Sequence, residues 1–234
     1  MLHRFALLTA LALGLAPIAA PLAAQAEGVR IPAPAAEAPA SGAGLETAVL
    51  AGGCFWGVQA VYQHVKGVSN AVSGYAGGAK SEADYASVSS GRSGHAEAVA
   101  VTFDPREISY GKILQIYFSV AHNPTELNYQ GPDHGPQYRS EIFPQSEAQA
   151  TIAKDYIAQL DAAHAFKAPI VTKTGTMKAA FFPAEAYHQD YAVKHPGQPY
   201  IVVNDAPKVV NLKALFADVW REEPRLTSEA AKTQ

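Results

Sequence analysis

The sequence has almost no cysteine. Cys54 is the only one among 234 residues, so the chain cannot form a disulfide within itself. An excess of one charge is also missing, because 18 basic and 21 acidic residues give a formal net charge of −3. This balance implies neither a nucleic acid nor an anionic membrane surface as a partner. The eight histidines lack the spacing of metal ligands, so no metal site is predicted.

The remaining composition is that of an ordinary globular protein. Hydrophobic residues make up 48% of the chain and charged residues 17%, which is enough material for one hydrophobic core. No internal repeat is present. We therefore predict one catalytic or binding domain, and we expect it to be a monomer.

The N-terminus has the pattern of a secretory signal peptide. A basic start at His3 and Arg4 is followed by an apolar run and by small residues that end at Ala26. The apolar run is broken by prolines and is short for a stable membrane span. We therefore predict a signal peptide over residues 1–26, an exported protein that is periplasmic or secreted, and no membrane span after cleavage.

Three further segments follow the predicted cleavage site. Residues 27–44 are rich in Ala, Pro and Gly and are predicted to be a flexible linker. The folded domain is predicted over residues 45–222, with a loose polar tail over 223–234. Export places the chain in an oxidising compartment, so its single thiol is either buried and inert or kept for its reactivity.

Apolar periodicity predicts the order of the elements. Alternating runs indicate strands, and runs with helical spacing indicate helices. The segments 76–94 and 125–137 show neither pattern and are predicted to be loops, while 200–203 is predicted to be a strand or an extended arm. The predicted strands are 47–50, 67–75, 95–103, 138–143 and 169–174, and the predicted helices are 58–65, 109–120, 146–164, 184–194 and 207–221.

This order predicts the fold class. A strand, a helix, two strands, a helix and a strand make the β-α-β-β-α-β core of a ferredoxin-like two-layer sandwich. We predict an α+β fold of this kind with C-terminal extensions.

Cys54 lies where a strand is predicted to turn into a helix. A thiol at a helix N-terminus faces free backbone N–H groups and the positive end of the helix dipole, which favour the thiolate. Cys54 is therefore a candidate nucleophile. The alternative is a small buried hydrophobic residue, which is how most free cysteines behave.

Other candidate residues lie in separate parts of the chain. Glu97 shares the apolar face of its strand with Val99 and Val101, where a carboxyl must be paired, protonated or functional. With Cys54 as nucleophile, the carboxyls of Glu97 and Asp133 and nearby phenols and aromatic rings form a set suited to an attack that expels a polar oxygen. The phenols are Tyr85 and Tyr138, and the rings are Phe55 and Trp56.

Four separated motifs resemble peptide methionine sulfoxide reductase A. They are GCFWG at 53–57, SGHAEAV at 93–99, DHGPQYRS at 133–140 and AEAYHQ at 184–189. The resemblance covers about residues 47–204, with the motifs in the order and spacing of that family.

The resemblance implies a repair enzyme that reduces the S epimer of methionine sulfoxide, free or in proteins. The thiolate of Cys54 would attack the sulfoxide sulfur, and Glu97 would protonate the oxygen or donate a hydrogen bond to it. Tyr85 and Tyr138 would help to polarise that oxygen. Glu97 must then be largely protonated at the start, which a half-apolar site favours. From the residues alone, Glu97 as a paired strand carboxylate and Tyr85 as a surface phenol stay open.

The resemblance also implies the remaining roles. Asp133 would order the hydrogen-bond network, and Phe55 and Trp56 would hold the methyl group of the substrate. Family members often carry a cysteine where this chain has Ser89, and many carry C-terminal resolving cysteines that are missing here. We therefore predict a one-cysteine subtype without a bound cofactor, in which an external, thioredoxin-like thiol reductant resolves a Cys54 sulfenic acid.

Three other functions compete with this hypothesis. A one-cysteine peroxidase would turn over hydrogen peroxide and needs an arginine near the thiol. A cysteine hydrolase using His188 and Asp133 would form an acyl-enzyme. A non-catalytic exported binding module would leave Cys54 unreactive toward iodoacetamide.

Overall fold

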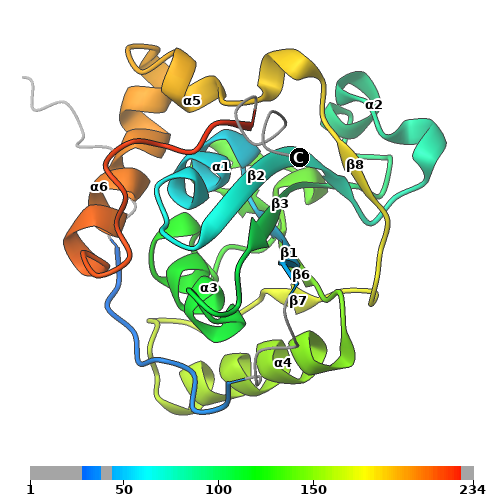
Figure 1. The fold of residues 1–234 in the computed structure, drawn as a ribbon. Helices are drawn as coiled ribbons and strands as arrows, with labels where there is room; N and C mark the ends of the chain where they lie inside the picture. Colours follow the sequence, from blue (N-terminus) through cyan, green and yellow to red (C-terminus); the bar gives the residue numbers. More distant parts are fainter. Residues whose placement is uncertain (1–27, 38–43, 228–234) are drawn as a thin grey trace, which may run out of the picture.

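The centre of the molecule is a six-stranded sheet in the order β7-β6-β1-β3-β2-β8 (Figure 1). A computed structural model of the chain describes residues 28–37 and 44–227. Neighbouring strands are antiparallel except β6 and β7. The strands are β1 (Glu46–Gly52), β2 (Val68–Ala76), β3 (Ala96–Phe103), β6 (Ser140–Phe143), β7 (Lys173–Thr174) and β8 (Phe181–Pro183).

Helices connect these strands. Two π-helices extend others, since η2 (Tyr117–Ala121) continues α3 and η5 (Ile201–Asp205) leads into α6. The α-helices are α1 (Phe55–Gln63), α2 (Tyr85–Ser89), α3 (Tyr110–Ile116), α4 (Glu147–Ala162), α5 (Tyr191–Lys194) and α6 (Ala206–Leu215). The short elements are the 3-10 turns η1 (Lys80–Glu82), η3 (Pro136–Tyr138) and η4 (Ala186–His188) and the paired strands β4 (Tyr129–Gln130) and β5 (Asp133–His134).

The inner four strands confirm the predicted fold class. Their order β6-β1-β3-β2, with α1 connecting β1 to β2 and α3 lying between β3 and β6, is that of a ferredoxin-like unit. α1 and η2 contact each other and both contact β1. Strand β1 therefore lies centrally, and its C-terminal end opens directly into the turn that carries Cys54.

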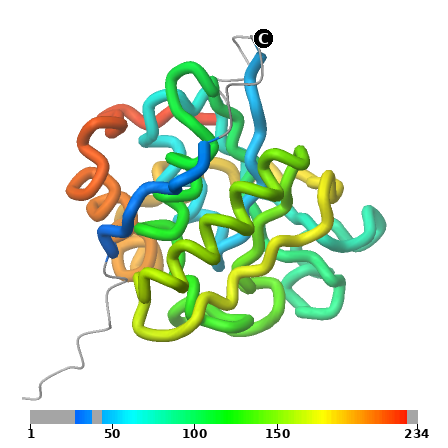
Figure 2. Tube along the Cα trace, turned by 90° about the horizontal axis from the view of Figure 1, so that it is seen from below, coloured from blue at the N-terminus to red at the C-terminus, as the bar shows by residue number. Residues whose placement is uncertain are grey.

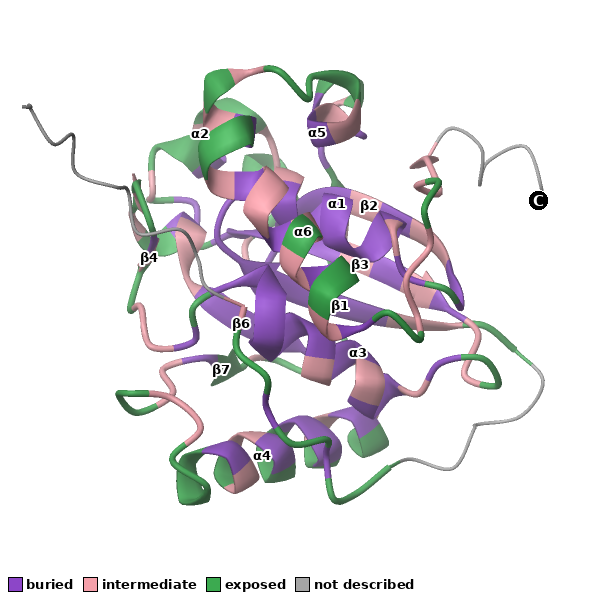
Figure 3. Ribbon diagram, turned by 90° about the vertical axis from the view of Figure 1, so that its left-hand side faces the viewer, coloured by how far each residue is buried: buried purple, intermediate pink, exposed green. Residues whose placement is uncertain are grey.

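Side chains of β1 alternate between two apolar clusters, as a period of two requires. Ala48 and Leu50 join the main core with residues of α1, α3 and α4. Val49 and Ala51 pack on the other face with Phe143. Both faces of the central strand are thus buried (Figure 3), which makes β1 a rigid support for the residue that follows it.

Helix α4 covers the main core from one side (Figure 3). Its predicted cap is confirmed, because the Ser146 side chain accepts a hydrogen bond from the Gln149 backbone N–H. Ile152, Tyr156 and Leu160 recur at helical spacing and are buried. The outer face of α4 is exposed.

Residues 28–37, inside the predicted linker, lie against the helices. In Figure 2 this blue segment crosses the molecule between α6 and α4. The Tyr156 hydroxyl donates to the Pro32 carbonyl at 2.6 Å, and the Gln115 side chain donates to the Ile31 carbonyl at 3.0 Å. Ile31 is buried in the main core. A proline-rich segment has few backbone donors, so side chains of α3 and α4 satisfy its carbonyls.

The variant Tyr156→Phe tests this attachment. It removes the donor to Pro32 but keeps the ring in the core, so the free energy of unfolding should fall by about 1 kcal/mol. Urea denaturation measures this change. Tyr187→Phe is the matched control, because Tyr187 is 60% exposed. Equal free energies of unfolding in the two variants would show that the hydrogen bond from Tyr156 to Pro32 does not contribute to stability.

Several element boundaries differ from those predicted. The predicted loop 76–94 contains η1 and α2, strand 138–143 begins only at Ser140, and segment 200–203 is helical. β7 keeps only the last two residues of the predicted strand 169–174, helix 184–194 splits into η4 and α5, and α6 ends at Leu215 rather than Arg221. The edge strand β8 pairs three residues with β2 and was not predicted. These short elements depend on tertiary contacts more than on periodicity.

The start of the predicted tail also contacts the domain. The Arg225 backbone N–H donates to the Gln63 carbonyl at 2.8 Å, and that of Thr227 donates to Asp190 at 3.0 Å. Among the described residues, no helix is long and apolar enough to cross a membrane. Residues 1–26, with the predicted signal peptide, lie outside the described part of the chain.

Candidate active site

Cys54 occupies the turn between β1 and α1. It is the N-cap residue of α1 and is 8% exposed. Gly53 before it has φ +84°, a left-handed conformation that strains other residues, and a Cβ there would meet Gln130. The predicted strand-to-helix turn is therefore present, and its geometry depends on glycine.

The pKa of the Cys54 thiol is raised well above its usual value. Burial is the main cause, followed by electrostatic interaction with Glu97 and Asp205. The backbone N–H of Trp56, which donates to the sulfur, and the ammonium of Lys208 lower the pKa but do not outweigh burial. The helix N-terminus favours the thiolate, as expected, but burial outweighs it and favours the thiol.

Glu97 lies close to Cys54 on strand β3. One of its carboxyl oxygens accepts a hydrogen bond from the backbone N–H of Phe55 at 3.0 Å, and Phe55 is the neighbour of Cys54 in sequence. Burial raises the pKa of Glu97 to about 8, against the opposing effect of this hydrogen bond. At neutral pH the carboxyl is therefore mainly protonated and able to donate a proton, in agreement with the sequence-based expectation.

Tyr138 and Tyr85 both lie close enough to Cys54 and Glu97 for those charges to affect their phenols. Burial raises the pKa of both phenols, and the charges of Glu97 and Cys54 add to this effect for each of them. Tyr138 is half-buried at the end of η3. The next residue, Arg139, anchors η3 because its guanidinium donates a hydrogen bond to the Gly94 carbonyl at 3.0 Å. Both phenols are thus neutral donors beside the thiol and the carboxyl.

The loop that carries Tyr85 is held by a glutamate of the AEAYHQ motif that was not among the predicted site residues. Glu185 accepts hydrogen bonds from the Tyr85 backbone N–H at 2.9 Å and from the Tyr75 hydroxyl at 2.8 Å. Tyr75 lies opposite Glu97 in the register of β2 and β3. Tyr85, 40% exposed, is therefore held at the rim of the site although its own helix has only five residues.

Asp133 contacts a tyrosine that the sequence did not reveal. The Tyr200 hydroxyl donates a hydrogen bond to the Asp133 carboxylate. Burial raises the pKa of Asp133, and burial and the negative charge of Cys54 raise that of Tyr200. Tyr200 precedes a π-helix in a segment whose pattern was ambiguous, so no signal in the sequence connected it to the thiol.

Phe55 and Trp56 form the aromatic wall of the site. Phe55 is fully buried and its ring centre lies 5.0 Å from that of His188. Trp56 stacks on Tyr191 at 3.9 Å, and its indole N–H donates to Nδ1 of His188 at 3.2 Å. Nδ1 is thus an acceptor, and burial lowers the pKa of His188, so the imidazole is neutral and fixes the indole plane.

Gly57, in the first turn of α1, lies against a buried ion pair. A Cβ at this position would clash with Asp205 and come within 2.9 Å of Lys208 Nζ. Alanine normally favours a helix over glycine by about 1 kcal/mol, but overpacking costs about 1–3 kcal/mol. We expect Gly57→Ala to lower stability in thermal unfolding. In Gly197→Ala, the control, the new methyl group meets nothing within 4 Å, and equal melting temperatures would contradict the contact.

The site thus combines one thiol, a protonated carboxyl, neutral phenols and an aromatic wall, and it brings together all seven residues singled out from the sequence. Within the described ranges, no group of three or more side chains could hold a metal ion. The chemistry available here is nucleophilic attack by sulfur with proton donation from oxygen acids.

Comparisons with known proteins agree on one family. The sequence profile described as peptide methionine sulfoxide reductase matches residues 46–219. "Peptide methionine sulfoxide reductase MsrA 2" of Mesorhizobium japonicum is 60% identical over 188 residues, covering 80% of this chain and 96% of the relative.

Two solved structures are also similar to the chain. Methionine sulfoxide reductase A of Corynebacterium diphtheriae has a TM-score of 0.55 and 30% identity, covering 77% of this chain and 92% of that one. Reduced Mxr1 of Saccharomyces cerevisiae has a TM-score of 0.58 and 31% identity, covering 66% and 87%.

Proposed function

We propose, for a chain that belongs to the peptide methionine sulfoxide reductase A family, that it reduces the S epimer of methionine sulfoxide through attack by Cys54. Membership makes the protein an oxidoreductase that reduces methionine sulfoxide. The proposal concerns the epimer, the residues, the reductant and the place of action.

The observation that carries the proposal is the buried, protonated Glu97 beside Cys54. A sulfoxide oxygen leaves sulfur poorly until it gains a proton. In the proposed step, Cys54 sulfur attacks the sulfoxide sulfur while the thiol proton and the Glu97 proton pass to the oxygen, which leaves as water when the S–O bond breaks. Water then attacks Cys54 sulfur and breaks the new S–S bond, which releases methionine and returns a proton to Glu97. In the net reaction methionine sulfur is reduced by two electrons and Cys54 sulfur is oxidised by two electrons to a sulfenic acid.

The other residues act on the two ends of the sulfoxide group. Tyr85 and Tyr138 are neutral phenols beside Glu97 and would donate hydrogen bonds to the oxygen. Phe55 and Trp56 would contact the methyl group, with the indole plane held by His188. Asp133, paired with Tyr200, would order the hydrogen-bond network around them.

Recycling needs a partner, because the whole sequence holds one cysteine. Two external thiols would reduce the Cys54 sulfenic acid, forming a disulfide and water. We propose a thioredoxin-like reductant. The N-terminal pattern over residues 1–26 supports export to the periplasm or beyond, where the enzyme would repair oxidised exported proteins.

A single-turnover assay tests the chemical proposal. Enzyme without reductant receives S- or R-methionine sulfoxide, methionine is counted per enzyme, and dimedone traps sulfenic acid. About one equivalent of methionine from the S epimer alone, with Cys54 trapped, is expected from the one-cysteine mechanism. Methionine from the R epimer would exclude the stereochemical assignment, and none from either epimer would exclude the reductase mechanism.

A further inference from the structure

Asp205 and Lys208 form a buried ion pair that the reaction proposed above does not use. Lys208 Nζ lies 3.3 Å from an oxygen of Asp205, and the exposed side-chain fractions are 11% for Lys208 and 0% for Asp205. In water-free surroundings charges act over a longer range than at the surface. A buried ion pair is weak evidence for a role in stability, because desolvation offsets the attraction.

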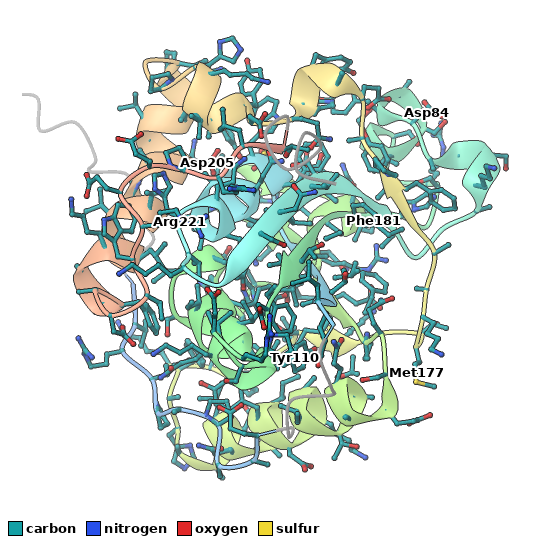
Figure 4. All side chains as sticks on the ribbon, viewed as in Figure 1. Asp84, Tyr110, Met177, Phe181, Asp205 and Arg221 are labelled. Carbon is teal, nitrogen blue, oxygen red and sulfur yellow. The ribbon has the colours of Figure 1, made fainter. Side chains whose placement is uncertain are left out.

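The pair lies under the helix that Cys54 begins. Figure 4 labels Asp205 beside the ribbon of α1, and α1 contacts both η5 and α6. A Cβ on Gly57, three residues after Cys54, would touch both charged groups. Asp205 is the last residue of the π-helix η5 and the N-cap of α6. Lys208 follows three residues later in the first turn of α6, so both charged side chains reach the first turn of α1.

One oxygen of Asp205 is left over. Oδ1 faces Lys208, whereas Oδ2 is buried and has no hydrogen-bond partner. Leaving a buried carboxylate oxygen unpaired is costly. The carboxylate charge therefore stays incompletely neutralised close to the thiol.

We propose that Asp205 and Lys208 are positioning residues that set the charge on Cys54 sulfur: Lys208 favours a negative sulfur and Asp205 opposes it. The inference rests on the proposed role of Cys54 as the nucleophile. Together the pair would keep the thiol protonated until substrate arrives and then help to hold the negative charge that develops during attack.

The charges acting on Cys54 agree with these opposite roles. Asp205 raises the pKa of the thiol and Lys208 lowers it. The groups of other elements that interact with Cys54 supply an acid and phenols; they are Glu97 of β3, Tyr85 of α2, Tyr138 of η3 and Tyr200 before η5. Asp133 of β5 acts on Glu97. Within the described surroundings of the thiol, Lys208 is the basic side chain that counters them.

The rate of Cys54 alkylation by iodoacetamide, measured against pH on the full domain, tests the proposal. The rate follows the thiolate fraction. Lys208→Gln should raise the apparent pKa by about one unit and slow alkylation at neutral pH about tenfold. Asp205→Asn should do the opposite. Controls are Lys213→Gln, whose ion pair with Glu222 is exposed, and Asp218→Asn, whose pair with Lys112 lies at the surface.

Opposite shifts in the two single variants support the proposal, since structural damage would move both in one direction. Equal directions, or shifts no larger than those of the controls, overturn it. If circular dichroism shows that a single variant does not fold, the double variant Asp205→Asn/Lys208→Gln replaces it, because it leaves no unpaired charge. The two opposite effects should largely cancel in this variant, so its alkylation rate should lie close to that of wild type, and a tenfold change in either direction overturns the proposal.

Alkylation needs no sulfoxide and no reductant, so its outcome is separate from that of the proposed function. An enzyme that forms no methionine but shows opposite alkylation shifts would keep the charge-setting role and lose the reductase mechanism. An enzyme that forms methionine but shows no opposite alkylation shifts would keep the reductase mechanism and exclude a role for Asp205 and Lys208 in setting the charge on Cys54.

Discussion

Replacing Cys54 with serine is expected to abolish methionine formation, lowering kcat by roughly 10⁴-fold or more. A serine hydroxyl is a far weaker nucleophile toward sulfur, and it cannot be oxidised to a sulfenic acid. The measurement is steady-state reduction of S-methionine sulfoxide with dithiothreitol as reductant. Activity above about 1% of wild type would show that another group reduces the sulfoxide.

The variant Cys54→Ser should lose activity without losing its fold. Cys54 is the N-cap of α1 but makes no side-chain cap hydrogen bond, whereas serine is a favoured N-cap residue. Stability should therefore be unchanged or slightly higher. Thiol titration of the unfolded proteins is the internal control, since wild type has one thiol and the variant has none. A large loss of stability would make the activity result uninformative about chemistry and contradict the description of the turn.

The second large effect is expected for Glu97→Gln. The amide keeps the size of the side chain but cannot give a proton to the leaving oxygen, so kcat should fall about 10²–10⁴-fold, the usual contribution of a general acid. Single-turnover methionine formation from the S epimer measures this loss. Glu141→Gln is a matched control on a strand of the same sheet, where the carboxylate pairs with Arg139. Equal losses in the two variants would remove Glu97 from its catalytic role.

The same substitution should make the protein more stable at high pH. Folding raises the pKa of Glu97 from 4.5 to about 8, so the folded state holds this proton more tightly. The contribution of this proton to the free energy of unfolding is complete below pH 4.5 and is lost as the pH rises through about 8. The loss is at most about 1.4 kcal/mol for each pH unit. In urea denaturation, Glu97→Gln should therefore be more stable than wild type by a few kcal/mol at pH 9, with a smaller difference at pH 5.5. A difference that does not depend on pH would mean that the carboxyl is not buried and protonated.

The predicted elements that the structure retains are those with long, regular patterns. β3 and α4 follow clear periods of two and 3.6 residues, and the caps Ser109 and Ser146 lie where expected. Apart from the end of α6, the errors mainly concern elements of two to five residues such as α2, β7 and η5. Elements this short have little periodicity, and their conformation depends on the partners against which they pack.

The same contrast holds for the site. Cys54, Glu97 and the residues of the DHGPQYRS motif could be singled out because they stand in unusual local contexts: a glycine-flanked lone thiol, a carboxyl on an apolar face, and a polar loop. Tyr200 and Lys208 have ordinary contexts in the sequence, and Glu185 lies in the AEAYHQ motif but was not predicted to be a site residue. Their importance comes from contacts with residues far away in the chain: Tyr200 contacts Asp133, 67 positions away, Glu185 contacts Tyr85, 100 away, and Lys208 lies against Gly57, 151 away.

The sequence alone determined the order of the strands and helices in the β-α-β-β-α-β core and the presence of a single thiol, because these follow from local periodicity and from counting one residue type. The predictions of Cys54 as nucleophile and of an external thiol as reductant rest on that count. Only the tertiary structure decided the protonation of the site. A helix N-terminus favours a thiolate, yet burial by the surrounding elements keeps Cys54 a thiol and Glu97 an acid. Desolvation depends on everything that surrounds a group, and the neighbours in the chain describe only a small part of those surroundings.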